Sequence, residues 1–129
     1  MKYKFLEDLI NKKQEKFVEA ANEIWGYAEL AYNEHQSSEF QIRFLEEEGF
    51  TIKRGVGGIE TAFTAEYGSG GPVIGFLGEF DALPGLSQKA DIARKEAIIE
   101  GGTGHGCGHQ LLGTGCMQAS VAVKDYIKE

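Results

Sequence analysis

Apolar residues in the first part of the chain recur mostly at steps of three and four, with charged residues between them. From about Phe5 to Ala28 this spacing predicts one amphipathic helix, which Gly26 can end early. Its apolar stripe would pack on a core. The stripe contains Leu6, Leu9, Ile10, Phe17, Ala21, Ile24, Trp25 and Ala28.

A second helix is predicted from about Glu34 to Glu48. Asn33 suits the N-cap position, and Gln36 follows it at the spacing of a capping box. Gly49 is placed to end the helix, and Phe50 is placed for the apolar contact of a Schellman motif. The buried face would consist of Phe40, Phe44 and Leu45.

Three strand candidates follow this helix. The segments Phe50–Arg54 and Thr61–Tyr67 alternate between apolar and polar residues, as half-buried strands do. Val73–Phe80 is nearly all apolar up to Glu79, which predicts a central strand covered on both faces. Glycine-rich turns at 55–58 and 68–72 connect the three. Neither Gly55–Gly58 nor the later run Gly101–Gly108 matches the dinucleotide-binding spacing, so we discount that function.

The second half of the chain is dominated by one more predicted helix, from Gln110 to about Lys128. It is apolar on several sides, which predicts that it is well buried. Gly113 and Gly115 near its start predict close backbone packing. Ala90–Ile99 has a helical composition and is expected to form a short helix or a mobile loop. Together these elements predict an α/β domain with helices packed on a small mixed sheet.

Composition narrows the possible functions. The chain has 129 residues, 42% of them hydrophobic and 26% charged, which is ordinary for one globular domain. Its net charge of -7 and the lack of a basic block argue against nucleic acid or an anionic membrane as partners. The charged start does not resemble a signal peptide. Cys107 and Cys116 are not expected to form a disulfide, which favours the reducing cytoplasm.

The most distinctive segment is the loop Gly101–His109, in which five of nine residues are glycine. Glycine lets the backbone turn sharply and bring His105, Cys107 and His109 toward one point. Thiolate and imidazole are good ligands for zinc and related ions. Two ligands do not complete a catalytic site, however, so a small buried thiol beside a solvated histidine is the alternative interpretation of Cys107 and His109.

A second candidate segment lies where the most apolar strand is predicted to end. Ligands of open α/β sheets gather beyond the carboxyl ends of strands, and Glu79 and Asp81 stand there. Asp81 can bind a metal or hold a metal-binding imidazole in place. The alternatives are a turn residue for Asp81 and a polar strand end for Glu79. His35 is expected to be a solvated or capping residue and not a ligand. The two segments together indicate a metal centre that activates water for hydrolysis.

Two stretches, Gly75–Gln88 and Gly104–Thr114, closely resemble the metal-dependent amidohydrolases of the M20 peptidase family. The aminobenzoyl-glutamate hydrolase and aminoacylase-like branch is the most similar. The segment Ile24–Ser38 also resembles the start of that family. Gln110 departs from the pattern, because relatives usually have aspartate or asparagine there.

The resemblance implies a zinc-peptidase-like three-layer α/β/α domain that hydrolyses the amide bond of N-acyl amino acids, dipeptide-like molecules or aminobenzoyl-glutamate. It implies that Cys107 and His109 bind the metal pair, manganese or zinc, and that Asp81 is the active-site aspartate. Glu79 falls where many relatives have a metal-binding histidine, and His105 is not expected to be a principal ligand.

The resemblance further implies that residues 1–129 are the amino-terminal part of a catalytic domain, without the rest of that domain and the lid domain. We therefore expect the isolated chain to be nearly inactive and the protein to be a homo-oligomer. Two other hypotheses remain at this point. One is a self-associating interaction module without catalysis. The other is thiol chemistry, with Cys107 as nucleophile and His105 or His109 as base.

Overall fold

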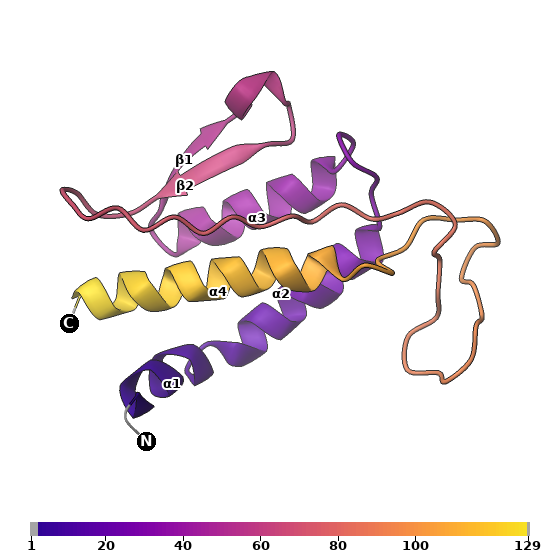
Figure 1. The fold of residues 1–129 in the computed structure, drawn as a ribbon, viewed down its shortest axis with the longest axis horizontal. Coiled ribbons are helices and arrows are strands. Elements are labelled where there is room, and N and C mark those ends of the chain that lie inside the picture. Colours follow the sequence, from indigo (N-terminus) through magenta and orange to yellow (C-terminus); the bar gives the residue numbers. More distant parts are fainter. Residues whose placement is uncertain (1–2, 129) are drawn as a thin grey trace.

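In the computed structural model, which describes residues 3–128, helices carry most of the regular structure (Figure 1). A small antiparallel hairpin accompanies them, so the predicted α/β class is confirmed. The elements, in chain order, are α1 (Lys4–Asn11), α2 (Gln14–Tyr27), α3 (His35–Glu47), β1 (Thr51–Arg54), the 3-10 turn η1 (Val56–Gly58), β2 (Phe63–Glu66) and α4 (His109–Lys128).

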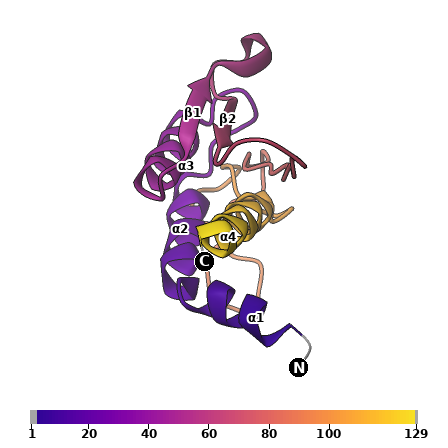
Figure 2. The same ribbon diagram turned by 90° about the vertical axis from the view of Figure 1, so that its left-hand side faces the viewer.

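The core lies where α2, α3 and α4 meet. Viewed end-on, α4 packs beside α2, and α3 with the hairpin lies above these two helices (Figure 2). The rings of Phe17 and Phe44 are 4.9 Å apart between their centroids. The buried cluster consists of Phe17, Ala20, Phe44, Leu45, Met117 and Val121.

The single helix predicted from Phe5 to Ala28 is wrong in one respect, because the structure divides it in two. Lys13 leaves the helical conformation, with φ -121° and ψ 11°, and α2 begins after it. This break turns α1 so that it packs against α4 instead of continuing the line of α2 (Figure 1). Gly26 stays helical, and the left-handed Ala28 ends α2.

The end of α3 matches its prediction, but the cap at its start does not. Gly49 has φ +90°, and the amides of Gly49 and Phe50 donate to the carbonyls of Glu46 and Leu45, which is the Schellman pattern. At the other end the predicted Asn33 cap is wrong. The Glu29 carboxylate takes its place.

Glu29 accepts hydrogen bonds from the backbone amides of Gln36 and Ser37, at 2.9 and 2.8 Å, and from the Ser37 hydroxyl at 2.8 Å. These amides belong to the first turn of α3 and have no partner within the helix. A carboxylate also interacts favourably with the positive end of a helix. Burial would raise the pKa of Glu29, but the hydrogen bonds from Gln36 and Ser37 outweigh it and lower the pKa.

The first two predicted strands pair as an antiparallel hairpin that packs on α3. Thr51 lies opposite Glu66, and Arg54 lies opposite Phe63. The third prediction is wrong: within residues 3–128, Val73–Phe80 is extended but belongs to no strand. This segment runs alongside α4 (Figure 1), and Val73 and Leu77 are 87% and 88% exposed. Its apolar character indicated burial on both faces, whereas only its end near Gly78 packs closely on α4.

The segment between residues 85 and 104 forms an irregular loop, so the short helix considered for Ala90–Ile99 is not present there. Glu96 holds the loop together through ion pairs with Lys89 and Arg94. Cys107 and Cys116 are both free thiols in the structure. Among the described residues, no helix combines the length and apolar character needed to cross a membrane.

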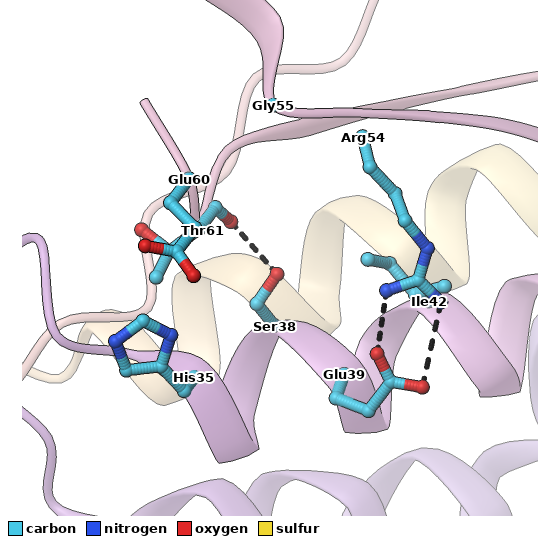
Figure 3. Close-up of a pocket in the computed structure, with 8 residues that line it drawn as sticks. All are labelled: His35, Ser38, Glu39, Ile42, Arg54, Gly55, Glu60 and Thr61. Carbon is cyan, nitrogen blue, oxygen red and sulfur yellow. Dashed lines mark hydrogen bonds and ion pairs between the residues drawn. The ribbon is translucent and has the colours of Figure 1, made fainter. Parts of the chain in front are cut away.

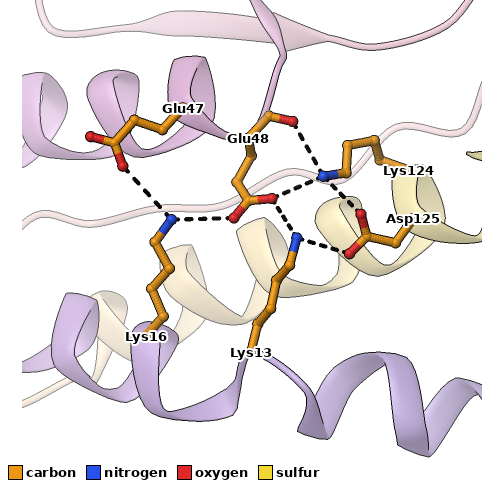
Figure 4. Close-up of polar contacts among 6 residues, drawn as sticks. All are labelled: Lys13, Lys16, Glu47, Glu48, Lys124 and Asp125. Carbon is orange, nitrogen blue, oxygen red and sulfur yellow. Dashed lines mark hydrogen bonds and ion pairs between the residues drawn. The ribbon is translucent and has the colours of Figure 1, made fainter.

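A cluster of charged side chains joins the ends of three helices (Figure 4). The Glu48 carboxylate contacts the ammonium groups of Lys13, Lys16 and Lys124, at 2.6, 3.2 and 2.9 Å. Asp125 pairs with Lys13 and Lys124. Burial would raise the pKa of Glu48, but hydrogen bonds from the three lysines lower it to about 2. The cluster therefore stays charged inside the fold.

Candidate metal centre

The segment that carries Glu79 and Asp81 is held by backbone hydrogen bonds on both sides. The amide of Ala82 donates to the Glu29 carbonyl at 2.7 Å, just after α2 ends. Leu83 and Gly104 exchange a pair of hydrogen bonds, each of 3.0 Å. The acidic segment thus lies between the end of α2 and the glycine loop, as the two-segment hypothesis requires.

His109, the first residue of α4, meets both carboxylates. Its Nδ1 lies 2.8 Å from Oδ1 of Asp81, and its Nε2 lies 3.3 Å from Oε2 of Glu79. Donor atoms of these three residues all lie within 4.8 Å of one another. The structure therefore brings together Asp81 and His109, two of the three predicted site residues, and adds Glu79.

The two ring nitrogens of His109 have different surroundings. A carboxylate oxygen accepts, so the contact with Asp81 places a proton on Nδ1 and leaves the lone pair of a neutral ring on Nε2. Asp81 is 21% exposed and Glu79 is 58% exposed. Asp81 is thus placed to fix the ring, whereas Glu79 stands on the side where a metal would bind.

Cys107, the other predicted ligand, is exposed and stands outside the group formed by Glu79, Asp81 and His109. Its role in metal binding stays a prediction. The histidine rings of the same loop are bonded elsewhere, His105 to the Ile24 carbonyl and His109 to Asp81. The thiol hypothesis needs one of these rings as a base for Cys107. The hydrogen bonds of both rings are instead made to Ile24 and Asp81.

His105 is 9% exposed, and its Nε2 lies 3.1 Å from the Ile24 carbonyl oxygen. Burial lowers the pKa of His105, with the hydrogen bond to Ile24 acting in the opposite direction. The buried Nδ1 of His105 and Oε1 of Gln110 have no hydrogen-bond partner within the described part of the chain. His105 therefore faces the protein interior.

Glycine is required where the site segments approach one another. A Cβ at Gly104 would lie 2.0 Å from the Leu86 carbonyl oxygen. A Cβ at Gly113 would lie 2.9 Å from the Glu79 carbonyl oxygen. The close packing predicted for Gly113 is thus confirmed. The same prediction for Gly115 is wrong, because a Cβ there would meet nothing within 4 Å.

A hollow of about 480 Å³ lies elsewhere, between α3 and the hairpin (Figure 3). Arg54 forms an ion pair of 2.5 Å with Glu39, and the Ser38 hydroxyl donates to the Thr61 carbonyl at 2.7 Å. His35 lines this hollow and is exposed, as predicted. The hollow shares no residue with the candidate metal centre, and these polar groups already satisfy one another.

Sequence reasoning missed one residue that builds the site. Glu29 caps α3 with its side chain and anchors Ala82 with its carbonyl. It lies 53 positions before Ala82 in the sequence, and no short-range spacing links the two. The only available signal was its place within Ile24–Ser38, the early stretch of the family resemblance.

Comparison of the sequence with known proteins relates the chain to a family. Over 127 residues the chain is 43% identical to a subunit of the p-aminobenzoyl-glutamate hydrolase of Escherichia coli (strain K12), a match that covers 98% of this chain and 26% of that protein. The chain belongs to this family of amidohydrolases. The resemblance to the M20 amidohydrolases is thereby confirmed. No family model matches the chain.

Two Xaa-Arg dipeptidases are also similar. The mouse protein is 33% identical over 113 residues, covering 80% of this chain and 22% of the relative. The human protein is 28% identical over 134 residues, covering 94% and 27%. The chain thus spans about a quarter of the length of the curated relatives it matches.

Proposed function

We propose that this chain contributes part of the metal centre of an amidohydrolase that cleaves the amide bond of N-acyl amino acids, dipeptide-like molecules or aminobenzoyl-glutamate-like substrates. The observation that carries the proposal is the position of His109 between Glu79 and Asp81. The names of the relatives, a p-aminobenzoyl-glutamate hydrolase and two Xaa-Arg dipeptidases, support the substrate class.

The donor set fits a divalent ion, manganese or zinc. His109 Nε2 and Glu79 Oε2 are 3.3 Å apart, and imidazole with carboxylate is a common pair of ligands for such ions. Cys107 is proposed as a further ligand from the same loop as His109. A bound ion would lower the pKa of a water molecule and polarise the substrate carbonyl.

Asp81 is proposed as the residue that fixes the imidazole. Its hydrogen bond holds Nδ1–H and keeps the free lone pair on Nε2. The complete enzyme is proposed to hold two ions and to need further ligands and a general base. Loss of a general base costs roughly 10²–10⁴-fold in rate. We therefore propose that residues 1–129, as part of a catalytic domain, hydrolyse such substrates slowly at best.

The test combines metal binding with turnover. Titration of the metal-free chain with Co²⁺ should give a saturable site with ligand-field absorption. His109→Ala should abolish this site, and the control His35→Ala, at an exposed position, should leave it unchanged. N-acyl amino acids with added Mn²⁺ should be hydrolysed hardly or not at all. A chain that binds no Co²⁺ contradicts the metal centre, and robust turnover contradicts the incomplete site.

We also propose small-molecule substrates, a cytoplasmic setting and a homo-oligomer. The free thiols of Cys107 and Cys116 support the reducing compartment. The run of exposed apolar side chains at Val73, Ile74, Phe76 and Leu77 supports association, because apolar surface of this kind is often covered by a partner.

A further inference from the structure

Both segments that carry the metal centre are tied to one place, the carboxyl end of α2. His105 Nε2 donates to the Ile24 carbonyl at 3.1 Å, and the Thr103 hydroxyl donates to the Ala28 carbonyl at 2.6 Å. From the acidic segment, the Ala82 amide donates to the Glu29 carbonyl. Residues 24–29 therefore receive three hydrogen bonds from parts of the chain that lie more than 50 positions away.

The end of a helix is suited to accept such hydrogen bonds. Carbonyls at and just after the end of a helix can accept hydrogen bonds from other segments, and the Ile24 carbonyl accepts from His105 in addition to the Ala28 amide. Ala28 leaves α2 in the left-handed conformation, with φ 46°, and its own carbonyl then accepts from Thr103. Ile24 is fully buried and His105 nearly so, so water does not readily replace their hydrogen bond.

The contact fixes the proton of His105. A carbonyl oxygen only accepts, so Nε2 must carry the hydrogen and Nδ1 holds the lone pair. Burial, which lowers the pKa of His105, favours this neutral form. His105 thus acts as a fixed donor and is not available as a metal ligand through Nε2.

The loop needs such an anchor because of its composition. Five of the nine residues in 101–109 are glycine, and each glycine loses more backbone freedom on ordering than other residues. His109 must nevertheless stay within hydrogen-bonding distance of Asp81 and close to Glu79. The hydrogen bonds of Thr103 and His105 fix the loop four to six positions before His109.

We propose that His105, assisted by Thr103, is a positioning residue that holds the glycine loop on the end of α2 so that His109 meets Asp81 and Glu79. The proposal rests on the proposed metal centre and assigns a role to the histidine that is not expected to bind the ion.

The first test compares two variants by Co²⁺ titration of the full chain. His105→Phe keeps ring volume and removes the donor, whereas His105→Gln keeps an amide N–H at a similar reach. Partners that orient metal ligands typically change metal affinity 10–100-fold when they are lost. We expect that loss in His105→Phe and recovery to within a few-fold of the original affinity in His105→Gln. His35→Phe, at an exposed histidine, is the matched control and should change nothing.

The second test needs no metal. In imidazole ¹H–¹⁵N spectra of the metal-free chain, His109 Nδ1–H should give a protected low-field signal from its bond to Asp81. The signal should be lost in His105→Phe and kept in His105→Gln. If His105→Phe does not fold by circular dichroism, Thr103→Val and Thr103→Ser replace the pair, because only serine keeps the hydroxyl that donates to Ala28.

A folded His105→Phe chain with unchanged Co²⁺ affinity and an intact His109 signal overturns the proposal. A His105→Gln chain as impaired as His105→Phe also overturns it, because the donor would then be irrelevant. If the unaltered chain binds no Co²⁺, the proposed function fails, and the His109 signal alone decides the role of His105.

Discussion

At the scale of single residues, the site depends on one imidazole between two carboxylates. Asp81 and His109 are evident from the sequence, because an acidic residue after an apolar run and a histidine in a glycine loop are local patterns. The sequence leaves Glu79 open between a ligand and a polar strand end. Its 3.3 Å contact with Nε2 of His109 makes it a candidate ligand in the structure.

Because the two carboxylates contact different nitrogens of His109, replacing each of them by its amide should have a different effect. Asp81→Asn should weaken Co²⁺ binding about 10–100-fold and remove the protected Nδ1–H signal of His109, since Asn is a poorer acceptor. Glu79→Gln should weaken Co²⁺ binding and alter its ligand-field spectrum, but keep that signal. Titration and imidazole spectra measure both effects. Glu66→Gln, at an exposed position on β2, is the control. Loss of the signal in Glu79→Gln would contradict the assigned roles.

At the scale of elements, the site is built by the approach of an extended segment to a helix. A Cβ at Gly78 would lie 3.0 Å from Cα of Gly113, and the Cys116 thiol donates to the Leu77 carbonyl at 3.1 Å. These contacts set the position of the Glu79 backbone against α4. Val73–Phe80 is apolar, yet its end near Gly78 packs against α4 and not within a sheet.

Two glycines in the first turns of α4 allow a matched test of this packing. Gly113→Ala should destabilise the chain by about 1–3 kcal/mol, because the new methyl group meets the Glu79 carbonyl and the backbone must shift. Gly115→Ala has free space and should stabilise the helix by roughly 0.5–1 kcal/mol. Urea unfolding measures both free energies. Equal effects of the two substitutions would show that the contact at Gly113 is unimportant.

At the scale of the whole molecule, α2, α3 and α4 are joined by the buried core and by the cluster around Glu48. The side chain of Glu48 is 8% exposed and that of Lys124 is 4% exposed. Charges so deeply placed are stable only while each keeps its partners. The cluster therefore couples the free energy of unfolding to pH.

Acid should destabilise the chain through this cluster. The Glu48 carboxyl has an ordinary pKa of 4.5 when unfolded and about 2 in the fold. Between these values the unfolded chain binds more protons, so stability falls as the pH falls. The contribution is complete above about pH 5. Glu48→Gln should cost about 2–4 kcal/mol at neutral pH and flatten the acid dependence of the free energy of unfolding.

Urea unfolding at a series of pH values between 2 and 7 measures this dependence. Glu47→Gln is the control. The Glu47 side chain is 69% exposed, and its Oε2 lies 3.7 Å from Nζ of Lys16. An exposed pair contributes at most about 1 kcal/mol. A Glu48→Gln chain with the original acid dependence would contradict the assignment to Glu48.

The sequence by itself determined the features that depend on near neighbours. The extents of α3 and α4, the glycine ending of α3 and the two hairpin strands follow from periodicity and from bonds between residues a few positions apart. The motif around Asp81 and His109 likewise indicated the family and its metal chemistry. Local patterns did not reveal the break at Lys13, before α2.

Only the tertiary structure decided which distant groups meet. It replaced Asn33 with Glu29 as the cap of α3, and it left Val73–Phe80 without a strand partner among the described residues. It also joined His105 to Ile24 across 81 positions. Such contacts depend on how whole elements pack. A buried donor needs a hydrogen-bond acceptor, and the packing of the elements decides which carbonyl is close enough to accept. For this reason Asp81 and His109 of the candidate metal centre were evident in the sequence, while their connection to the end of α2 was not.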